Sequence, residues 1–188
     1  MDELFLSGID EFTNTSSQIT ASAYEFYYPA YATGNGGSIF INANNINVTD
    51  QAGIVAFSQS TGNGGDITIH ATNIKLSDKG QINSVSTRTG QAGNLFLTAD
   101  DSIIIDNASV TTSALQSDGG DITLRAQQLL YLNEASITTS VQGGSGNGGN
   151  IDIDPILVAL NHSDITADAQ GGNGGNITLV TDNYISSP

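Results

Sequence analysis

Three aspartates recur at the same place in successive repeats of this sequence, four residues before an apolar residue that opens a strand. They are Asp50, Asp78 and Asp106, and Asn133 and Asn161 take the same place further along. In a stack of parallel strands such residues would lie ~4.8 Å apart. Carboxylates this close repel one another unless a cation or hydrogen bonds intervene, and calcium is the oxygen-seeking cation that suits them. The column is a candidate calcium site, although we favour the alternative that each aspartate caps its own turn and points into water.

The two histidines do not extend this column into a metal site. His70 and His162 fall in different coils, and the chain has no cysteine to complete a ligand set. Zinc sites draw their ligands from Cys and His at short, regular spacings, which are missing here. We therefore expect no cofactor, with calcium as the one ion left to consider.

Composition and charge argue against several classes of partner. The chain of 188 residues has a formal net charge of -15 and only 4 Lys and Arg residues, so its surface should repel nucleic acid and anionic lipid. No stretch reaches the roughly 20 apolar residues of a membrane span, and the acidic start Met1-Asp2-Glu3 is unlike a signal peptide. We expect no membrane insertion. Because the sequence stops partway through a repeat, we also expect it to be a piece of a longer protein.

A glycine-rich tetrapeptide, Gly-Asn-Gly-Gly, marks an internal repeat. Its copies begin at Gly34, Gly62, Gly146 and Gly172, with divergent versions at Gly90 and Ser117. Consecutive copies are 26 to 29 residues apart, and a constant period of this length indicates a solenoid of stacked units. A leucine-rich repeat would need a helical half that is missing. The calcium-binding RTX repeats recur every nine residues or so, not once per coil.

Each repeat contains three short stretches in which apolar and polar residues alternate, the pattern of half-buried strands. The first stretch follows the glycines, and one such strand is too small to bury its own apolar face. Like positions must therefore stack between coils to form a core. We predict that this stacking places four side chains inward, one above another: Ile67, Leu95, Ile122 and Ile151.

The predicted fold is all-β, a parallel β-helix of about five complete coils of 26–29 residues with three short strands each. Residues 34–188 would form the repeats, with a truncated last coil. Residues 1–33 would form a partial N-terminal coil that carries an aromatic loop or cap.

Residues 146–169 carry a family resemblance most clearly. They read Gly-Asn-Gly-Gly-Asn-Ile-Asp-Ile-Asp-Pro-Ile-Leu-Val-Ala-Leu-Asn-His-Ser-Asp-Ile-Thr-Ala-Asp-Ala, which resembles the repeat region of filamentous-haemagglutinin-like large exoproteins. The resemblance covers residues 34–188 and implies a right-handed parallel β-helix. It also implies secretion by a Gram-negative bacterium through two-partner secretion, and a role in adhesion. The N-terminal secretion domain of the family is not recognisable in this sequence.

From the resemblance we expect a structural or adhesive rod segment of a secreted or cell-surface exoprotein, which presents a repetitive surface for attachment. Its partners would be an outer-membrane two-partner transporter for the longer parent chain, and a glycan or protein receptor on a host or other surface. The alternatives are a carbohydrate-active β-helix enzyme and a nonfunctional fragment of an exoprotein gene.

The residues that catalyse reactions in known β-helix enzymes are missing from this sequence. Parallel β-helices include polygalacturonases, which cluster aspartates with Gly-His-Gly and Arg-x-Lys elements, and pectate lyases, which use Arg or Lys bases beside calcium. Here Asp100-Asp101 is the only Asp-Asp pair, Arg88 and Arg125 are isolated, and no tryptophan is available to stack on a sugar. We assign no catalytic residue and do not expect an enzyme.

Four asparagines share one place in the glycine-rich turns and should stack in a row: Asn35, Asn63, Asn147 and Asn173. Stacked amides can hydrogen-bond along the axis, and asparagine tolerates the left-handed backbone conformation that a tight corner needs. We favour this structural turn ladder over the alternative, a row that binds glycans.

Aromatic residues gather ahead of the first complete coil. Tyr24, Phe26, Tyr27, Tyr28 and Tyr31 fall within one short segment. Loops on a rigid scaffold often carry binding, and tyrosine suits contacts with carbohydrate or protein. The segment is a candidate binding loop, although we favour a cap over the open end of the first coil, since solenoid ends need capping.

Overall fold

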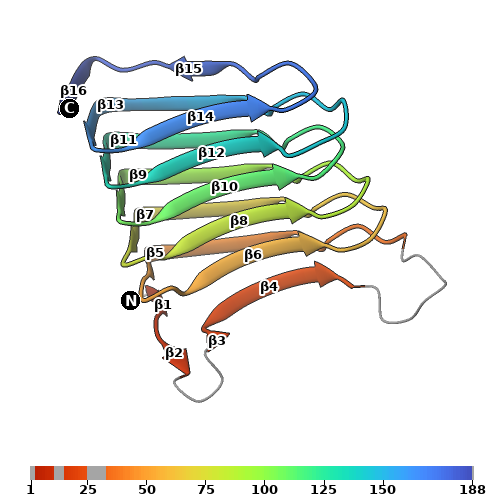
Figure 1. Ribbon diagram of the computed structural model, residues 1–188. Helices are drawn as coiled ribbons and strands as arrows, with labels where there is room; N and C mark the ends of the chain where they lie inside the picture. The colour runs from red at the N-terminus through yellow and green to blue at the C-terminus, as the bar shows by residue number, and fades with distance from the viewer. Residues whose placement is uncertain (1–2, 11–14, 25–32, 188) are drawn as a thin grey trace.

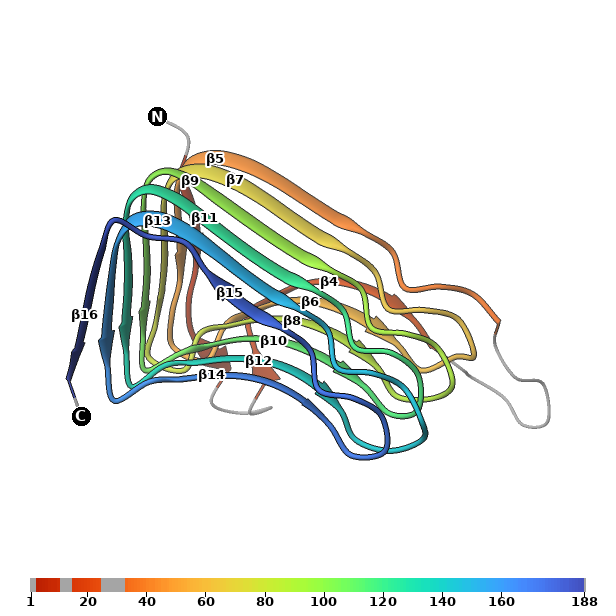
Figure 2. The same cartoon turned by 90° about the horizontal axis from the view of Figure 1, so that it is seen from above.

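The computed structural model describes residues 3–10, 15–24 and 33–187, and it is all-β. Parallel strands stack as a solenoid of about 5 turns, which confirms the predicted fold class (Figure 1). Seen from above, the chain runs counter-clockwise as it rises towards the viewer, so the solenoid is right-handed (Figure 2). The described residues contain no helix, and so none that could cross a membrane.

The larger sheet has 8 strands and receives one long strand from every complete coil. These are β5 (Ile39–Val48), β7 (Ile67–Ser77), β9 (Leu95–Asp106), β11 (Ile122–Asn133) and β13 (Ile151–Asn161). Its ends are formed by β1 (Glu3–Leu6), β15 (Ile177–Leu179) and β16 (Asn183–Ser187). The register shifts after Ala71 and after Ala126, where the long strands turn a corner. The first two strands predicted for each coil are therefore two halves of one bent strand.

The smaller parallel sheet has 6 strands, which correspond to the third strand predicted for each coil. They are β4 (Gln18–Ala23), β6 (Gly53–Ser58), β8 (Gln81–Ser86), β10 (Ser109–Ala114), β12 (Ser136–Val141) and β14 (Asp164–Ala169). A short antiparallel pair, β2 (Ile9–Asp10) and β3 (Thr15–Ser16), precedes β4. Tight corners join the larger sheet to the smaller one, and the glycine-rich turns lead back.

The core consists of apolar columns that run along the solenoid axis between the two sheets. Ile67 pairs in register with Leu95, Leu95 with Ile122, and Ile122 with Ile151. All four side chains are fully buried, which confirms their predicted inward stacking. The core is therefore continuous from coil to coil, as a solenoid without an internal core in each unit requires.

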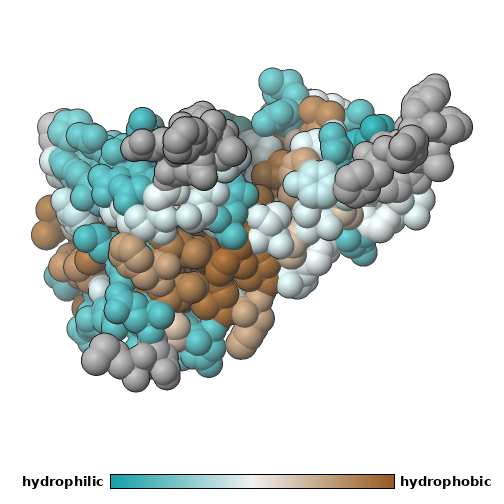
Figure 3. Space-filling model, turned by 90° about the horizontal axis from the view of Figure 1, so that it is seen from below, coloured by the Kyte–Doolittle hydropathy of each residue, from teal (hydrophilic) through white to brown (hydrophobic). Residues whose placement is uncertain are grey.

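The lower end of the solenoid is an incomplete coil. β1 pairs with the second half of β5, and β4 pairs with β6. No described strand pairs with the lower edge of residues 39–43. A cavity of about 390 Å³ opens there, lined in part by Leu4, Ile19 and Ile41. Figure 3 shows apolar surface gathered over this end.

We predict that Ile122→Asp destabilises the fold severely, because it places an unpaired charge in a dry core. The expected loss is at least about 3 kcal/mol in the free energy of unfolding, measured by urea or thermal melting. The milder Ile122→Val should cost about 1 kcal/mol and keep the chain folded for measurement.

The matched control is Ile156→Asp, the same substitution at a side chain that is 46% exposed on β13. This change should alter stability far less than Ile122→Asp does, by about 1 kcal/mol or less, because the side chain is already half exposed and the new charge stays in water. Equal effects at the two positions would contradict the assignment of Ile122 to the core.

Candidate functional site

The glycine-rich turns stack so closely that they leave no room for a side chain at their last position. At each of five glycines an added Cβ would lie 1.9 to 2.2 Å from the carbonyl oxygen of the equivalent glycine one coil below: Gly65, Gly93, Gly120, Gly149 and Gly175. None of the five has a positive φ. Glycine is therefore required here for space between coils, and not for an unusual backbone conformation.

The asparagine between these glycines forms a ladder on the outside of the stack. Asn35 Oδ1 accepts a hydrogen bond from the backbone N–H of Asn63 at 2.9 Å, and Asn63 Oδ1 accepts one from the N–H of Gln91 at 3.0 Å. Higher up, Asn147 Oδ1 accepts one from the N–H of Asn173 at 3.1 Å. Each side chain points along the axis and accepts from a backbone N–H of the next coil, which would otherwise bond only to water.

The divergent turns keep the ladder with other side chains. Gln91 donates from Nε2 to Asp118 Oδ2 at 3.1 Å, and Asp118 Oδ1 accepts from the N–H of Asn147 at 2.8 Å. A carboxylate accepts such bonds as well as an amide does. The divergent turns therefore still connect one coil to the next.

A second outer ladder, which our sequence analysis missed, lies three residues further along each turn. Asp66 Oδ1 accepts from the N–H of Asn94 at 2.7 Å, Asn94 Oδ1 from that of Asp121 at 2.9 Å, and Asp121 Oδ1 from that of Asn150 at 2.7 Å. Asn150 Oδ1 then accepts from Asn176 at 3.0 Å. The signal was present in the sequence as an Asn or Asp directly after the paired glycines, just before the apolar alternation begins.

Buried hydroxyl groups hold the same turns from inside. Ser84 Oγ donates to the carbonyl of Gly65 at 2.9 Å and accepts from the N–H of Gly93 at 2.9 Å. In the coils above, Thr112 and Thr139 donate to the carbonyls of Gly120 and Gly149 at 2.6 and 2.7 Å. These hydroxyls supply partners to glycine backbone groups that the sheets do not reach.

The left-handed backbone that we predicted for the turn asparagines lies at the other corner of the coil. Neither Asn63 nor Asn147 has a positive φ, so that part of the prediction is wrong. Positive φ values occur where the larger sheet leads into the smaller one, at Asp50, Gln51, Asp78, Lys79, Asn107, Glu134 and His162. The turn asparagines are used for their side-chain acceptors instead.

The predicted aspartate column is not one column. Asp50 and Asp78 have φ values of 53° and 49° and form the corner, whereas Asp106 ends β9 in register with Ser77. Asn107, with φ 48°, occupies the corner in that coil. The first two corners are one residue longer than the later ones. Counting four residues back from the apolar residue of the next strand therefore reaches the corner itself at Asp50 and Asp78, but the end of β9 at Asp106.

The three carboxylates hydrogen-bond to different partners, and Asp106 lies in another row than Asp50 and Asp78. Asp50 accepts from the hydroxyl of Ser7. Asp78 Oδ2 accepts from Thr49 Oγ1 at 3.1 Å, and Asp106 Oδ1 accepts from Asn133 Nδ2 at 2.6 Å. Asn161 continues the row of Asp106 by donating to Asn133. Within the described ranges, no group of three or more His, Asp and Glu side chains could hold a metal ion.

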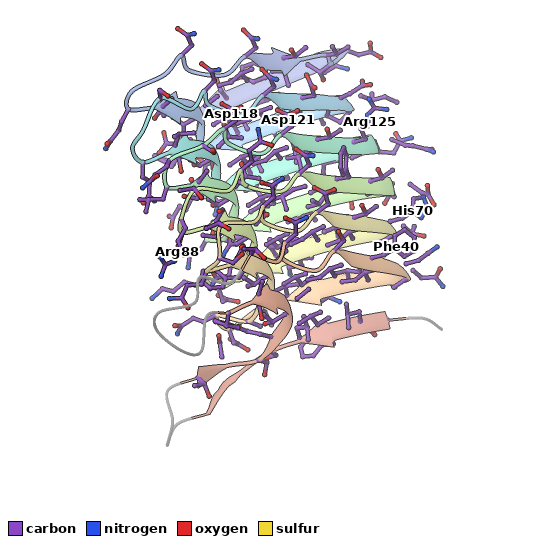
Figure 4. The ribbon with its side chains drawn as sticks, turned by 90° about the vertical axis from the view of Figure 1, so that its right-hand side faces the viewer. Phe40, His70, Arg88, Asp118, Asp121 and Arg125 are labelled. Carbon is purple, nitrogen blue, oxygen red and sulfur yellow. The ribbon has the colours of Figure 1, made fainter. Side chains whose placement is uncertain are left out.

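Other ionisable side chains project from the outer surface (Figure 4). Asp118 and Asp121 lie on the stacked turns in the middle of this view, with His70 and Arg125 to one side and Arg88 to the other. The imidazole Nε2 of His70 lies 3.5 Å from Asp100 Oδ1, and these side chains are 46% and 50% exposed. An exposed pair of this kind makes a small contribution to stability and offers no desolvated group for catalysis.

One surface combines a cavity with aromatic side chains. A cavity of about 610 Å³ lies where the smaller sheet meets the glycine-rich turns, and Thr87, Arg88 and Leu115 help to line it. On the same sheet the rings of Tyr24 and Phe57 lie with their centroids 5.4 Å apart. The rest of the predicted aromatic loop, Phe26, Tyr27, Tyr28 and Tyr31, is outside the described residues.

Comparison of the chain with protein-family models, curated proteins and solved structures finds no match.

We predict that Gly120→Ala destabilises the fold by roughly 3 kcal/mol or more, because its Cβ would lie 2.0 Å from the carbonyl oxygen of Gly93. Gly34→Ala is the matched control, since its Cβ would meet no atom within 4 Å. Thermal melting of both variants measures the difference. Similar melting temperatures would show that the turns do not stack this closely.

We also predict different outcomes for two changes at one rung of the outer ladder. Asn63→Ala leaves the N–H of Gln91 without its acceptor and should cost about 1 kcal/mol, whereas Asn63→Asp retains an oxygen there. Melting both variants in enough salt to screen the added charge checks this. A loss as large for aspartate as for alanine would contradict the acceptor role.

Proposed function

We propose that this chain is a rod segment of a secreted or cell-surface bacterial exoprotein of the filamentous-haemagglutinin-like kind, and that its repetitive surface serves attachment. The observation that carries the proposal is the continuous parallel pairing of strands from coil to coil in both sheets. Ile39, Ile67, Leu95, Ile122 and Ile151 occupy one column, and the smaller sheet repeats with the same period.

A rod function is supported by how the coils hold together. Each coil contacts its neighbours through two sheets and two outer ladders, and the same set recurs in successive coils. A structure held together by nearest-neighbour contacts can be lengthened by adding coils without redesign. Such a scaffold suits a part that separates a binding region from a cell.

An attachment role is supported by the outer face of the smaller sheet. Asn83, Thr111, Thr138 and Thr166 follow one another in register and point outward as a half-buried polar column. The cavity beside this column adds amide, hydroxyl and guanidinium groups around the apolar side chain of Leu115. Polar groups that surround an apolar contact suit a sugar ring, and the net charge of -15 favours a neutral polymer over an anionic one.

The ligand class that we propose is thus a neutral polysaccharide on a host or other surface. Export of the longer parent chain would use an outer-membrane two-partner transporter. The alternative of a carbohydrate-active enzyme has no comparable support among the described residues, since the exposed pair of His70 and Asp100 is its nearest approach to a catalytic arrangement.

Beads coated with the chain test this function on surfaces of immobilised neutral polysaccharide. We expect them to attach more than beads coated with a folded acidic protein of similar charge. Leu115→Asp should lower attachment by roughly 5- to 30-fold, because it places a charge at an apolar contact. Phe40→Asp is the control, since Phe40 is also exposed but lies on the larger sheet.

Attachment no better than that of the acidic control protein would overturn the adhesive role. Attachment that Leu115→Asp and Phe40→Asp reduce equally would place it elsewhere on the surface. Attachment to protein-coated surfaces alone would replace the polysaccharide by a protein receptor.

A further inference from the structure

One strip of the outer surface is apolar and has no part in the core or in the proposed attachment surface. In the second halves of β9, β11 and β13 every other side chain is buried in the core, so the residues between them face outward. Five of these outward residues are apolar and only half-buried, and together we call them the outer apolar strip: Ile104, Leu129, Tyr131, Leu157 and Ala159. Tyr131 lies in register between Ile104 and Ala159, and Leu129 lies beside Leu157.

The outer apolar strip lies far from the proposed attachment surface. Seen from above, the second halves of the long strands form the side of the solenoid opposite the glycine-rich turns (Figure 2). The cavity lined by Leu115 lies at those turns. A partner that covers the strip therefore leaves the cavity open.

The surface along the strip carries no carboxylate from β5 to β13, although the chain has a net charge of -15. Exposed aspartates occur on the other sides of the solenoid, for example Asp66, Asp154 and Asp168. Two copies of this acidic chain can therefore meet along the strip without placing carboxylates opposite one another. The outward residues here form two columns, Asn45, Asn73, Ser102, Leu129 and Leu157 in one, and Asn47, Lys75, Ile104, Tyr131 and Ala159 in the other.

We propose that two copies of the chain pair side by side through the outer apolar strip, with antiparallel solenoid axes and with β11 of one copy facing β11 of the other. A two-fold axis along β11 keeps each position along the strand and reverses the order of the coils. Leu129 and Tyr131 then face their own counterparts, and Ile104 faces Ala159 of the second copy. The contact is self-complementary, as a two-fold interface requires, and it has aromatic rings at its centre.

An axis along β9 would match the two copies less well. It would place Leu129 opposite Asn73 of the second copy, and so bury an amide against an apolar side chain without a hydrogen bond.

Lys75 favours the antiparallel arrangement over a parallel one. It is exposed, it lies in the column of Tyr131 two coils below, and within the described ranges it makes no ion pair. In a parallel pair each coil would face the same coil of the second copy, so two Lys75 ammonium groups would meet with no carboxylate between them. Antiparallel pairing keeps both at the rim, and like charges thus act against the wrong arrangement.

The contact is small, so the pairing should be weak. Four coil spacings of ~4.8 Å separate β5 from β13, which makes the carboxylate-free surface about 19 Å long. Interfaces that bury less than about 1,200 Å² in total are typical of transient complexes. The net charge of -15 also makes whole copies repel one another, and salt screens this repulsion. We therefore expect pairing to increase with protein concentration and with salt.

Sedimentation equilibrium of the full chain tests the pairing from about 10 μM to about 1 mM protein, in ~0.1 M and ~1 M sodium chloride. The mass should rise from the 19.4 kDa of one chain towards twice that value. Tyr131→Asp places two carboxylates face to face on the axis and should raise the dissociation constant at least about tenfold, whereas Tyr131→Phe should keep the pairing. Phe40→Asp is the control, because it adds the same charge at an exposed aromatic residue outside the strip. Thermal melting shows that each variant is folded.

Chemical cross-linking tests the arrangement without Tyr131→Asp. The chain has no cysteine, so a single introduced thiol can react only with its counterpart in a second copy. A short bismaleimide should join two copies of Leu129→Cys, which face each other in the antiparallel pair. It should not join two copies of Lys75→Cys, which would face each other only in a parallel pair.

Three results would overturn the proposal. They are a mass of one chain at every concentration and salt, an equal loss of pairing in Tyr131→Asp and Phe40→Asp, and faster cross-linking of Lys75→Cys than of Leu129→Cys. None of these variants except the control Phe40→Asp enters the bead experiment, and none lines the cavity beside Leu115. A failure of pairing therefore leaves the attachment role standing, and a failure of attachment leaves the pairing standing.

Discussion

The close approach of backbone to backbone at the glycine-rich turns is the constraint on which this structure depends. The sheets set the distance between coils at about one strand spacing, ~4.8 Å, and the turns must follow the same spacing. At Gly93 and Gly120 a single added carbon would overlap the carbonyl below. The chain therefore repeats glycine at this position in every coil, even where the neighbouring asparagine has been replaced, as at Asp118.

This close approach excludes side chains from the glycine-rich turns, so the backbone groups of these turns must be paired by other means. The outer ladders and the buried hydroxyl groups of Ser84, Thr112 and Thr139 provide those partners. The ladders act between coils, so each coil fixes the turn of its neighbour, whereas Thr112 and Thr139 bond to the turn that follows their own strand. A backbone donor that is paired in this way contributes to the stacking of coils, and not only to the shape of one turn.

The sequence was sufficient to predict the fold because the same pattern of turn and strands recurs along the chain. A period of 26 to 29 residues and the apolar alternation after the glycines together leave few architectures. The inward column of Ile67, Leu95 and Ile122 followed directly from that alignment. Features that depend on turn length were not predictable in the same way, since the aspartate column required every corner to have equal length. Asp106 and Asn107 show that the corners differ by one residue.

The second ladder was missed for a different reason. An Asn or Asp beside a strand is ordinary in sequence, and its side chain becomes distinctive only when the N–H of the next coil lies above it, as Asn94 lies above Asp66. The proposed attachment surface has the same origin, since Thr111 and Thr138 become neighbours only after the coils stack. Stacking thus produces both the stability of the rod and the regular surface that we propose it presents.

Residue-resolved hydrogen exchange of the folded chain tests most directly whether side-chain ladders hold the coils together. The backbone amides of Gln91, Asn94 and Asp121 lie in turns and bond only to side-chain oxygens of the coil below. We predict that these amides exchange as slowly as the amide of Ile69 within β7. Exchange as fast as that of Thr89, an exposed turn residue, would contradict it.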